Sequence, residues 1–267
     1  MFQIRAKIVY NKRVKEPYHL LAVQGGGIAS KAAPGQFLQI KVNKGLEPLL
    51  RRPFSIHAIR GTLIEILYEV VGEGSSILSK RKAGEFIDII GPLGNGFSAA
   101  KAPNTGKNKE LKPVLVVGGI GVAPLFFLAK KLKQAKPVVL IGARTKSLII
   151  CEKEFLESGC DVKTATDDGS FGFKGRVTEL LEKTLSSIDY RLLTIYACGP
   201  EPMLKEISRI ALKHNIPAQI SLEAHMACGI GACLGCVVNT KEGFKRVCKE
   251  GPVFNCETIV WQKKGAG

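Results

Sequence analysis

Residues 113–124 read PVLVVGGIGVAP, and this stretch decides how the second half of the chain folds. Its apolar run predicts a buried strand, and Gly118, Gly119 and Gly121 end that strand in a turn leading into a helix. Such a turn presents backbone N–H groups at a helix N-terminus, where a pyrophosphate can bind. The glycines do not follow the G-x-G-x-x-G spacing of the Rossmann fingerprint, and a purely structural turn has the same composition, so both interpretations stay open.

Strand and helix patterns alternate from this stretch onward. Each predicted helix follows a short apolar strand, and the helices are expected near residues 122–134, 152–158, 176–187 and 201–214. This alternation is typical of a parallel sheet with right-handed crossovers. Residues 113–222 are therefore predicted to form an α/β domain.

Two strand ends in this domain carry candidate site residues. Cys198, Gly199 and Pro200 lie at the carboxyl edge of the sheet, where α/β proteins bind ligands, although Cys198 could equally be an ordinary buried thiol. Asp167 follows the third strand, and a carboxylate there can accept a hydrogen bond from the 2′-hydroxyl of an adenine ribose. Asp167 therefore favours NAD over NADP, with an exposed Asp-Gly turn as the alternative.

Residues 1–98 show short alternating runs that predict an antiparallel barrel or sandwich. Residues 99–112, AAKAPNTGKNKELK, are polar and aperiodic and are predicted to be a linker. In the β half, Arg52 and a Gly-Ser turn at Gly74 and Ser75 could together hold a pyrophosphate. A surface arginine and a helix N-cap would account for the same residues.

A cysteine group distinguishes the last segment, residues 223–267. Its spacing is C-x4-C-x2-C-x11-C, formed by Cys228, Cys233, Cys236 and Cys248. The first three spacings match the plant-type 2Fe–2S pattern. A structural zinc site is the alternative, but zinc sites favour paired C-x2-C elements and only one pair is present here. Cys256 is the alternative fourth ligand.

The formal net charge of +16 raises the question of nucleic-acid binding. No recognition motif accompanies the scattered lysines, so a metal-stabilised nucleic-acid-binding module is kept only as the alternative of another class. The start, MFQIRAKIVY, has no continuous apolar segment of the secretory type. The longest apolar run is short and broken by Gly and Pro. We therefore expect a cytoplasmic protein with neither membrane nor nucleic acid among its partners.

Four motifs in order resemble the ferredoxin–NADP reductase superfamily: RPFS from Arg52, GEGSS from Gly72, GGIGVAP from Gly118 and CGPEPM from Cys198. With MACGIGACLGC and RVCKEGPVF added, the chain resembles the electron-transfer subunits of class B dihydroorotate dehydrogenases. The resemblance extends from residue 1 to about residue 256.

The resemblance implies a fold of class β plus α/β, with a FAD-binding antiparallel β-barrel, a parallel-sheet NAD-binding domain and a small C-terminal 2Fe–2S domain. It implies FAD contacts at Arg52, Pro53, Phe54, Ser55, Leu67, Tyr68, Glu69, Gly74 and Ser75. It implies nicotinamide-side contacts at Gly118, Gly119, Gly121, Gly199 and Pro200. Cys198 would lie near the flavin as the candidate catalytic residue, and the four spaced cysteines would ligate the cluster.

The activity implied by the resemblance is electron transfer in de novo pyrimidine biosynthesis. Dihydroorotate would be oxidised to orotate on a separate FMN-containing catalytic subunit, and electrons would pass through the 2Fe–2S cluster and FAD to NAD+. A flavin is needed because nicotinamide exchanges two electrons at once and a cluster carries one. A heterotetramer with two copies of each subunit is expected, with diaphorase activity in this subunit alone. The alternative within the superfamily is the small subunit of an NAD-dependent ferredoxin:NADP or sulfide reductase.

Overall fold

The structure is a computed structural model that describes residues 1–43, 45, 47–98, 112–186 and 193–261. The predicted linker therefore lies outside the described residues except for Lys112, which begins a strand. The predicted helix end at residue 187 also lies outside them.

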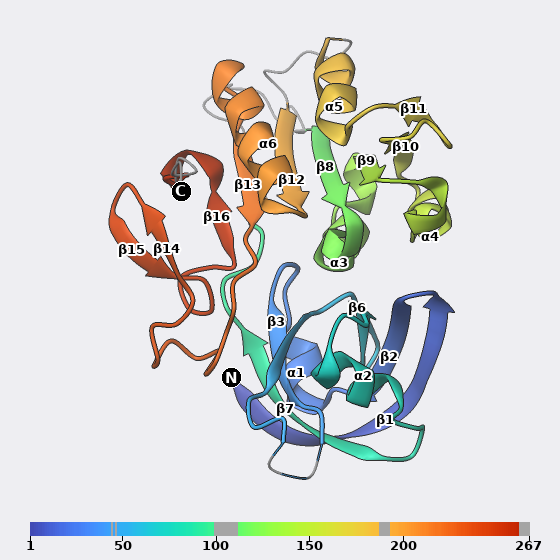
Figure 1. Ribbon diagram of the computed structural model, residues 1–267, viewed down its shortest axis with the longest axis vertical. Helices are drawn as coiled ribbons and strands as arrows, with labels where there is room; N and C mark the ends of the chain where they lie inside the picture. Colours follow the sequence, from blue (N-terminus) through green and yellow to red (C-terminus); the bar gives the residue numbers. More distant parts are fainter. Residues whose placement is uncertain (44, 46, 99–111, 187–192, 262–267) are drawn as a thin grey trace.

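The first sheet is antiparallel and has the strand order β4-β3-β7-β1-β2-β6-β5. Its strands are β1 Phe2–Lys15, β2 Tyr18–Gln24, β3 Phe37–Lys41, β4 Arg52–Ser55, β5 Ala58–Arg60, β6 Leu63–Glu69 and β7 Phe86–Leu93. The edge strands β4 and β5 are consecutive in the chain, and the residues between them bond to both sides: Ile56 N donates to Gln36 O and His57 N donates to Glu65 O. These bonds curl the sheet into the predicted barrel (Figure 1).

Two short helices flank the barrel, α1 Gly26–Lys31 and α2 Glu73–Ser79. A helix start near Gly74 and Ser75 was the alternative interpretation of the Gly-Ser turn, and α2 begins there. Helix α1 was not expected, because a glycine run is a poor helix former. Burial of Ile28 and Ala29 in the barrel core accounts for α1.

The second sheet has the order β11-β10-β9-β8-β12-β13-β16. Its strands are β8 Lys112–Gly118, β9 Val138–Ala143, β10 Asp161–Thr166, β11 Phe173–Lys174, β12 Leu193–Cys198, β13 Ala218–Ser221 and β16 Val253–Asn255. All pairs are parallel except β13 with β16. The chain order reverses between β8 and β12, which creates a crevice at the carboxyl ends of these strands.

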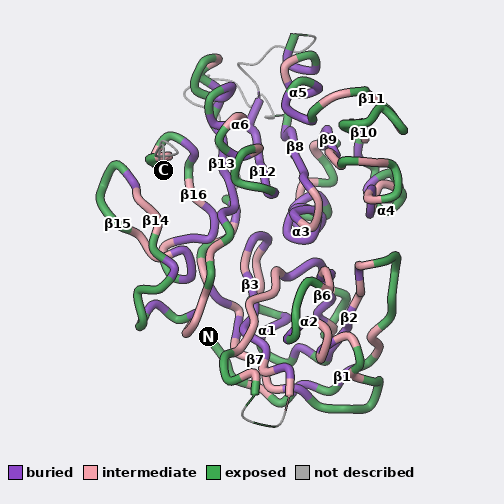
Figure 2. The backbone as a smooth tube through the Cα atoms, viewed as in Figure 1, coloured by how far each residue is buried: buried purple, intermediate pink, exposed green. Residues whose placement is uncertain are grey.

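The helices of this domain match the four predicted ones: α3 Val122–Lys131, α4 Glu152–Glu157, α5 Val177–Leu185 and α6 Glu201–Lys213. Short 3-10 turns occur at Gly119–Gly121, Lys133–Ala135, Lys146–Leu148 and Cys256–Thr258. Leu115 and Val117 of β8 pack with α3 and α4, whereas Val114 and Val116 pack with α5 and α6. Because helices cover both faces, the central strands are buried along their length (Figure 2).

The last segment forms a hairpin of β14 Val237–Thr240 and β15 Gly243–Arg246 before returning as β16 to the edge of the second sheet. The loop between β13 and β14 carries three of the spaced cysteines and reaches the barrel, where Gly229 lies against Gln39 of β3. Among the helices of the described residues, none has the length and apolar character needed to cross a bilayer.

Candidate functional site

A cleft of about 970 Å³ opens at the crevice between β8 and β12. The predicted residues Gly118, Gly119, Gly121, Asp167, Gly199 and Pro200 all line it. A Cβ atom at Gly121 would lie 2.2 Å from the carbonyl oxygen of Cys198, and one at Gly118 would lie 2.7 Å from Sδ of Met203. Glycine is therefore required here because the two strand ends approach each other too closely for any side chain.

The cleft is lined by two arginines and several carboxylates, since Glu179, Glu182 and Glu206 of α5 and α6 also belong to its wall. Asp167 lines it together with Arg144 and Arg176. The next residue, Asp168, instead accepts hydrogen bonds from the backbone N (2.9 Å) and hydroxyl (2.6 Å) of Ser170, which hold the pKa of its carboxyl below the usual value. Sequence reasoning missed both arginines, since isolated basic residues carry no motif, yet guanidinium groups suit the phosphates of a dinucleotide.

A second pocket, of about 360 Å³, lies between the barrel and the α/β domain. The structure brings together in it the predicted residues Pro53, Phe54, Ser55, Leu67, Tyr68, Glu69 and Cys198. Phe54 and Tyr68 pack edge to face, with ring centroids 5.5 Å apart. Part of the wall comes from Ser221 to Ala224, which sequence reasoning did not identify because that segment has no motif of its own, and part from Met226, which begins the cysteine-loop motif. Apolar and aromatic walls with a few polar groups suit a flat heteroaromatic ring such as a flavin.

The two pockets adjoin, because Glu69, Ile120 and Glu223 line both. Although Glu223 is an exposed residue, desolvation of its carboxyl at the junction of the two pockets, reinforced by the nearby Glu69, raises the pKa of that carboxyl. Burial also raises the pKa of the Cys198 thiol, and the charge of Glu223 adds to this, although a hydrogen bond with Ser221 lowers it. Cys198 is therefore a neutral thiol at neutral pH, able to donate a weak hydrogen bond but not to act as a thiolate.

Arg52, Gly74 and Ser75 lie together at the start of α2, and none of them is among the described residues that line the two pockets. A Cβ atom at Gly74 would lie 2.7 Å from Nε of Arg52, so the arginine side chain packs directly over this glycine. The Ser75 hydroxyl accepts hydrogen bonds from the backbone N of Val71 (3.0 Å) and Gly72 (3.1 Å). The structure thus joins the predicted arginine to the predicted Gly-Ser turn, while the serine hydroxyl closes the turn itself.

The cysteine loop presents backbone amides to its sulfur atoms. Cys228 Sγ accepts from the backbone N of Ala232 (3.3 Å) and of Cys233 (3.4 Å), and Cys236 Sγ accepts from the backbone N of Cys248 (3.4 Å). Gly229 and Gly231 have φ angles of +70° and +87°, which let the loop turn around the sulfurs.

The thiols are neighbours in two pairs, because Cys233 shifts the pKa of Cys228 and Cys236 shifts the pKa of Cys248. Burial raises the pKa of Cys228, but hydrogen bonds from the backbone N–H groups of Ile230 and Cys233 and their neighbours outweigh it and bring the pKa to about 6. A thiol of this kind is mostly thiolate at neutral pH and is ready to bind iron.

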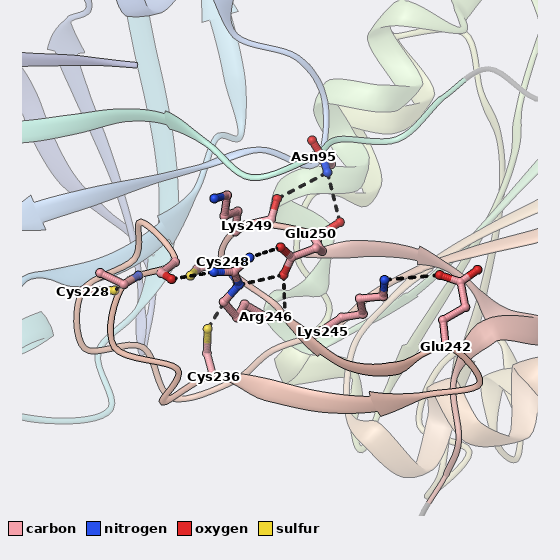
Figure 3. A network of polar contacts seen from close by, with 11 residues as sticks. Asn95, Cys228, Cys236, Glu242, Lys245, Arg246, Cys248, Lys249 and Glu250 are labelled. Atoms are coloured by element: carbon pink, nitrogen blue, oxygen red, sulfur yellow. Dashed lines mark hydrogen bonds and ion pairs between the residues drawn. The ribbon is translucent and has the colours of Figure 1, made fainter.

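An ion pair between Arg246 and Glu250 lies next to the cysteine loop, as Figure 3 shows. Arg246 Nη1 donates to the carbonyl of Gly231 (2.8 Å), and Arg246 Nε donates to Glu250 Oε2 (3.0 Å). This pairing lowers the pKa of Glu250 to about 2. Asn95, at the end of the barrel, donates through Nδ2 to the carbonyl of Glu250 (3.1 Å). The network ties the cysteine loop to the barrel, and no sequence motif pointed to it.

The donor set fits a 2Fe–2S cluster, because four thiols meet in two pairs and backbone amides point at the sulfurs. Within the described ranges, no three His, Cys, Asp or Glu side chains are grouped so as to hold one metal ion. A 2Fe–2S cluster needs no such group, since its four thiolates are shared between two irons. Cys256 is buried at the start of a 3-10 turn, and burial and Glu257 raise its pKa to about 11.

Comparisons with known proteins agree with this arrangement. Residues 223–260 match the iron-sulfur cluster binding domain of dihydroorotate dehydrogenase B, and residues 115–209 match the oxidoreductase NAD-binding domain. Two similar relatives are the electron transfer subunits of dihydroorotate dehydrogenase B (NAD(+)) from Desulforamulus reducens and Caldanaerobacter subterraneus. The first is 40% identical, over 96% of this chain and 98% of the relative. The second is 38% identical, over 97% and 99%.

Solved structures show the same fold. The NADH-dependent reduced ferredoxin-NADP oxidoreductase superposes with a TM-score of 0.82 at 30% identity, over 97% of this chain and 90% of that one. A ferredoxin NADP+ reductase from Neisseria gonorrhoeae with bound FAD and NADP gives a TM-score of 0.65 at 17% identity, over 79% and 91%. The extent and level of the sequence identity show that the chain belongs to the family of electron transfer subunits of NAD-dependent dihydroorotate dehydrogenase B.

Proposed function

We propose that this chain carries electrons from the FMN of a separate dihydroorotate-oxidising subunit to NAD+, through a 2Fe–2S cluster and FAD. The observation that supports this most strongly is the adjacency of the two pockets, which share Glu69, Ile120 and Glu223, in a chain that also holds the paired cysteines. A nicotinamide ring in the cleft would meet a flavin ring in the second pocket at these shared residues. The protein is thus an oxidoreductase subunit of pyrimidine biosynthesis.

The cofactors are FAD, a 2Fe–2S cluster and NAD, and bound FAD supplies the exchange between hydride transfer and single-electron transfer. Pro53, Phe54 and Ser55 of β4 and Leu67, Tyr68 and Glu69 of β6 hold the flavin. Arg52, Gly74 and Ser75 hold its pyrophosphate, the first through its guanidinium group and the turn through backbone N–H groups. Cys228, Cys233, Cys236 and Cys248 hold the cluster.

Residues that line one or both of the two pockets orient the rings. Cys198 contributes a neutral S–H group at the end of β12, next to the glycine turn that carries the nicotinamide. Desolvation and the nearby Glu69 raise the pKa of the Glu223 carboxyl at the junction of the two pockets, so it releases its proton at a higher pH than an ordinary carboxyl. Asp167 accepts from the adenine ribose and makes NAD the preferred nucleotide.

The catalytic partner docks over the cysteine loop. Cys233 is exposed, and Ile230 and Leu234 beside it are 46% and 60% exposed. Apolar side chains flanking a redox group suit a contact that excludes water between two electron carriers. The assembly contains two copies of each subunit and is cytoplasmic. Within this chain, the barrel domain comprises residues 1–98, the nucleotide domain residues 113–222 and the cluster domain residues 223–267. Residues 99–112 are the linker between the first two domains.

The experiment that tests the division of labour uses the purified full chain alone. We expect bound FAD, a 2Fe–2S signal in electron paramagnetic resonance (EPR) after reduction, NADH-dependent reduction of artificial acceptors, and no oxidation of dihydroorotate. Robust dihydroorotate oxidation by the isolated chain would refute the proposal. A colourless protein would favour a zinc-stabilised nucleic-acid-binding module instead.

The second candidate function is that of the small subunit of an NAD-dependent ferredoxin:NADP or sulfide reductase. It is favoured by the similarity to the NADH-dependent reduced ferredoxin-NADP oxidoreductase, which is 30% identical to this chain. The neighbouring genes distinguish the two functions: a gene for a dihydroorotate-oxidising subunit supports the first, and a gene for a glutamate-synthase-like subunit supports the second.

A further inference from the structure

Gln39 is the one residue of the described barrel strands whose buried side-chain amide has neither of its polar atoms satisfied. The side chain lies in the middle of β3, is 0% exposed, and has no hydrogen-bond partner for Nε2 or Oε1. Leaving an amide buried without a partner costs free energy, so such groups in folded proteins point to a partner that completes them.

The position of this amide shows which part of the chain it faces. A Cβ atom built on Gly229 would lie only 2.3 Å from Nε2 of Gln39, so the amide touches the backbone of the residue that follows Cys228. Gly229 has φ +70°, and only glycine fits both this conformation and this contact. The cysteine loop is therefore shaped to lie directly against the Gln39 side chain.

On its other side, Gln39 adjoins the flavin pocket. It pairs across the ladder with Pro53 of β4, which lines that pocket. Directly opposed residues of an antiparallel pair point to the same face, with Cβ atoms about 5 Å apart. Gln39 thus stands between the wall of the flavin pocket and the loop that carries the cluster ligands, although it does not itself line the pocket among the described residues.

We propose that Gln39 is a positioning residue for electron transfer: its Nε2–H group donates a hydrogen bond to a sulfur atom of the 2Fe–2S cluster. This inference rests on the proposed function. One-electron reduction makes the cluster more negative, and a buried donor aimed at sulfur stabilises the reduced form more than the oxidised form. The hydrogen bond therefore raises the reduction potential of the cluster. No bond breaks at Gln39 and no proton moves through it.

The test is Gln39→Leu in the full-length, FAD-loaded protein, with the cluster followed by EPR during a redox titration. Leucine keeps a similar volume and removes both unpartnered atoms, so the variant is expected to fold. At the wild-type midpoint potential, the ratio of reduced to oxidised cluster should fall about tenfold, which is about 59 mV for a one-electron couple. The FAD potential should not move.

Two further variants sharpen the result. Gln39→Glu places a negative charge beside the cluster and should lower its potential further, and it carries the same test if the leucine variant loses its cluster. Gln24→Leu makes the same chemical change at the exposed end of β2 and should leave the potential unchanged. An unmoved cluster potential in the Gln39 variants, or a shift confined to FAD, overturns the inference. A wild-type protein without a 2Fe–2S signal would instead contradict the proposed function.

Discussion

Cys198 at the end of β12 and Cys228 in the cysteine loop have opposite surroundings. Cys198 is fully enclosed, and burial together with Glu223 raises the pKa of its thiol. Cys228 is partly exposed, and backbone N–H groups bring its pKa to about 6 despite some burial. Cys248, another predicted cluster ligand, differs from Cys228, since burial and the neighbouring thiol of Cys236 raise its pKa to about 12. The direction of a thiol's pKa shift therefore depends on the balance between burial and the backbone N–H groups that point at the sulfur.

Replacing Cys228 with serine should have the largest effect, because it removes a thiolate from the loop. We expect loss of the 2Fe–2S signal and a fall of more than about 100-fold in cluster-dependent electron transfer, beyond the usual cost of losing an outer-shell partner. NADH-dependent reduction of artificial acceptors should persist, since the pockets around Cys198 are untouched. EPR and a diaphorase assay on one preparation check both. Loss of both activities would show that the two regions are not independent.

The exposed side of the cysteine loop is tested by Leu234→Asp. If the catalytic partner docks there, the charge should cost about 2 kcal/mol or more of binding, roughly 30-fold in Kd. Isothermal titration calorimetry with the partner subunit measures it. Leu212→Asp, on the 53% exposed Leu212 of α6, is the matched control and should bind normally. If both variants weaken binding of the partner subunit equally, the docking surface does not lie on the cysteine loop.

Asp167→Ser tests the nucleotide cleft at its adenine end. Losing a charged acceptor should reduce the preference for NADH over NADPH by about 10-fold, as expected for one charge-assisted hydrogen bond. Arg144 and Arg176 remain to attract a 2′-phosphate. The ratio of kcat/KM values in the diaphorase assay reports the change. Asp168→Ser should leave the ratio unaltered, because Asp168 is engaged with Ser170. An unchanged ratio in Asp167→Ser would show that its carboxylate does not read the ribose.

Cys198→Ala tests the neutral thiol itself. Removing one weak donor should slow flavin reduction by NADH about 5-fold, corresponding to about 1 kcal/mol, and leave the cluster potential unchanged. Stopped-flow absorbance follows the flavin directly. Cys160→Ala is the control, since Cys160 is also a buried thiol of the same core but does not line either pocket among the described residues. If NADH reduces the flavin at the same rate in the wild type and in Cys198→Ala, the thiol has a packing role only.

The smallest effect is expected from Glu223→Gln, measured as thermal stability against pH. Desolvation of the carboxyl at the junction of the two pockets raises the folded-state pKa of the exposed residue Glu223 above the usual 4.5, so its contribution to stability is fully present below pH 4.5 and is lost as the pH rises through the folded pKa. Glutamine has no such loss. The melting temperature of the variant, relative to that of the wild type, should therefore increase as the pH rises from 4.5. A constant difference across that range would mean that Glu223 titrates normally.

The two regions also differ in how far they could be predicted from the sequence. Three of the four cysteines lie within one short loop, so their spacing alone predicted the cluster. The alternating strands and helices predicted the parallel sheet, and the short alternating runs of residues 1–98 predicted the antiparallel one. No motif contains the wall from Ser221 to Ala224, the arginines Arg144 and Arg176, or the buried Gln39. Their roles depend on which strand ends and loops meet in space, and local spacing contains no such information.

The most direct test of the account is dihydroorotate-dependent NAD+ reduction by this chain co-expressed and purified with an FMN-containing dihydroorotate dehydrogenase catalytic subunit. We predict that the activity appears only in the complex and is lost in the complex carrying Cys233→Ser. Undiminished activity with Cys233→Ser, or an inactive wild-type complex that contains FMN, FAD and the cluster, would contradict the proposed path of electrons.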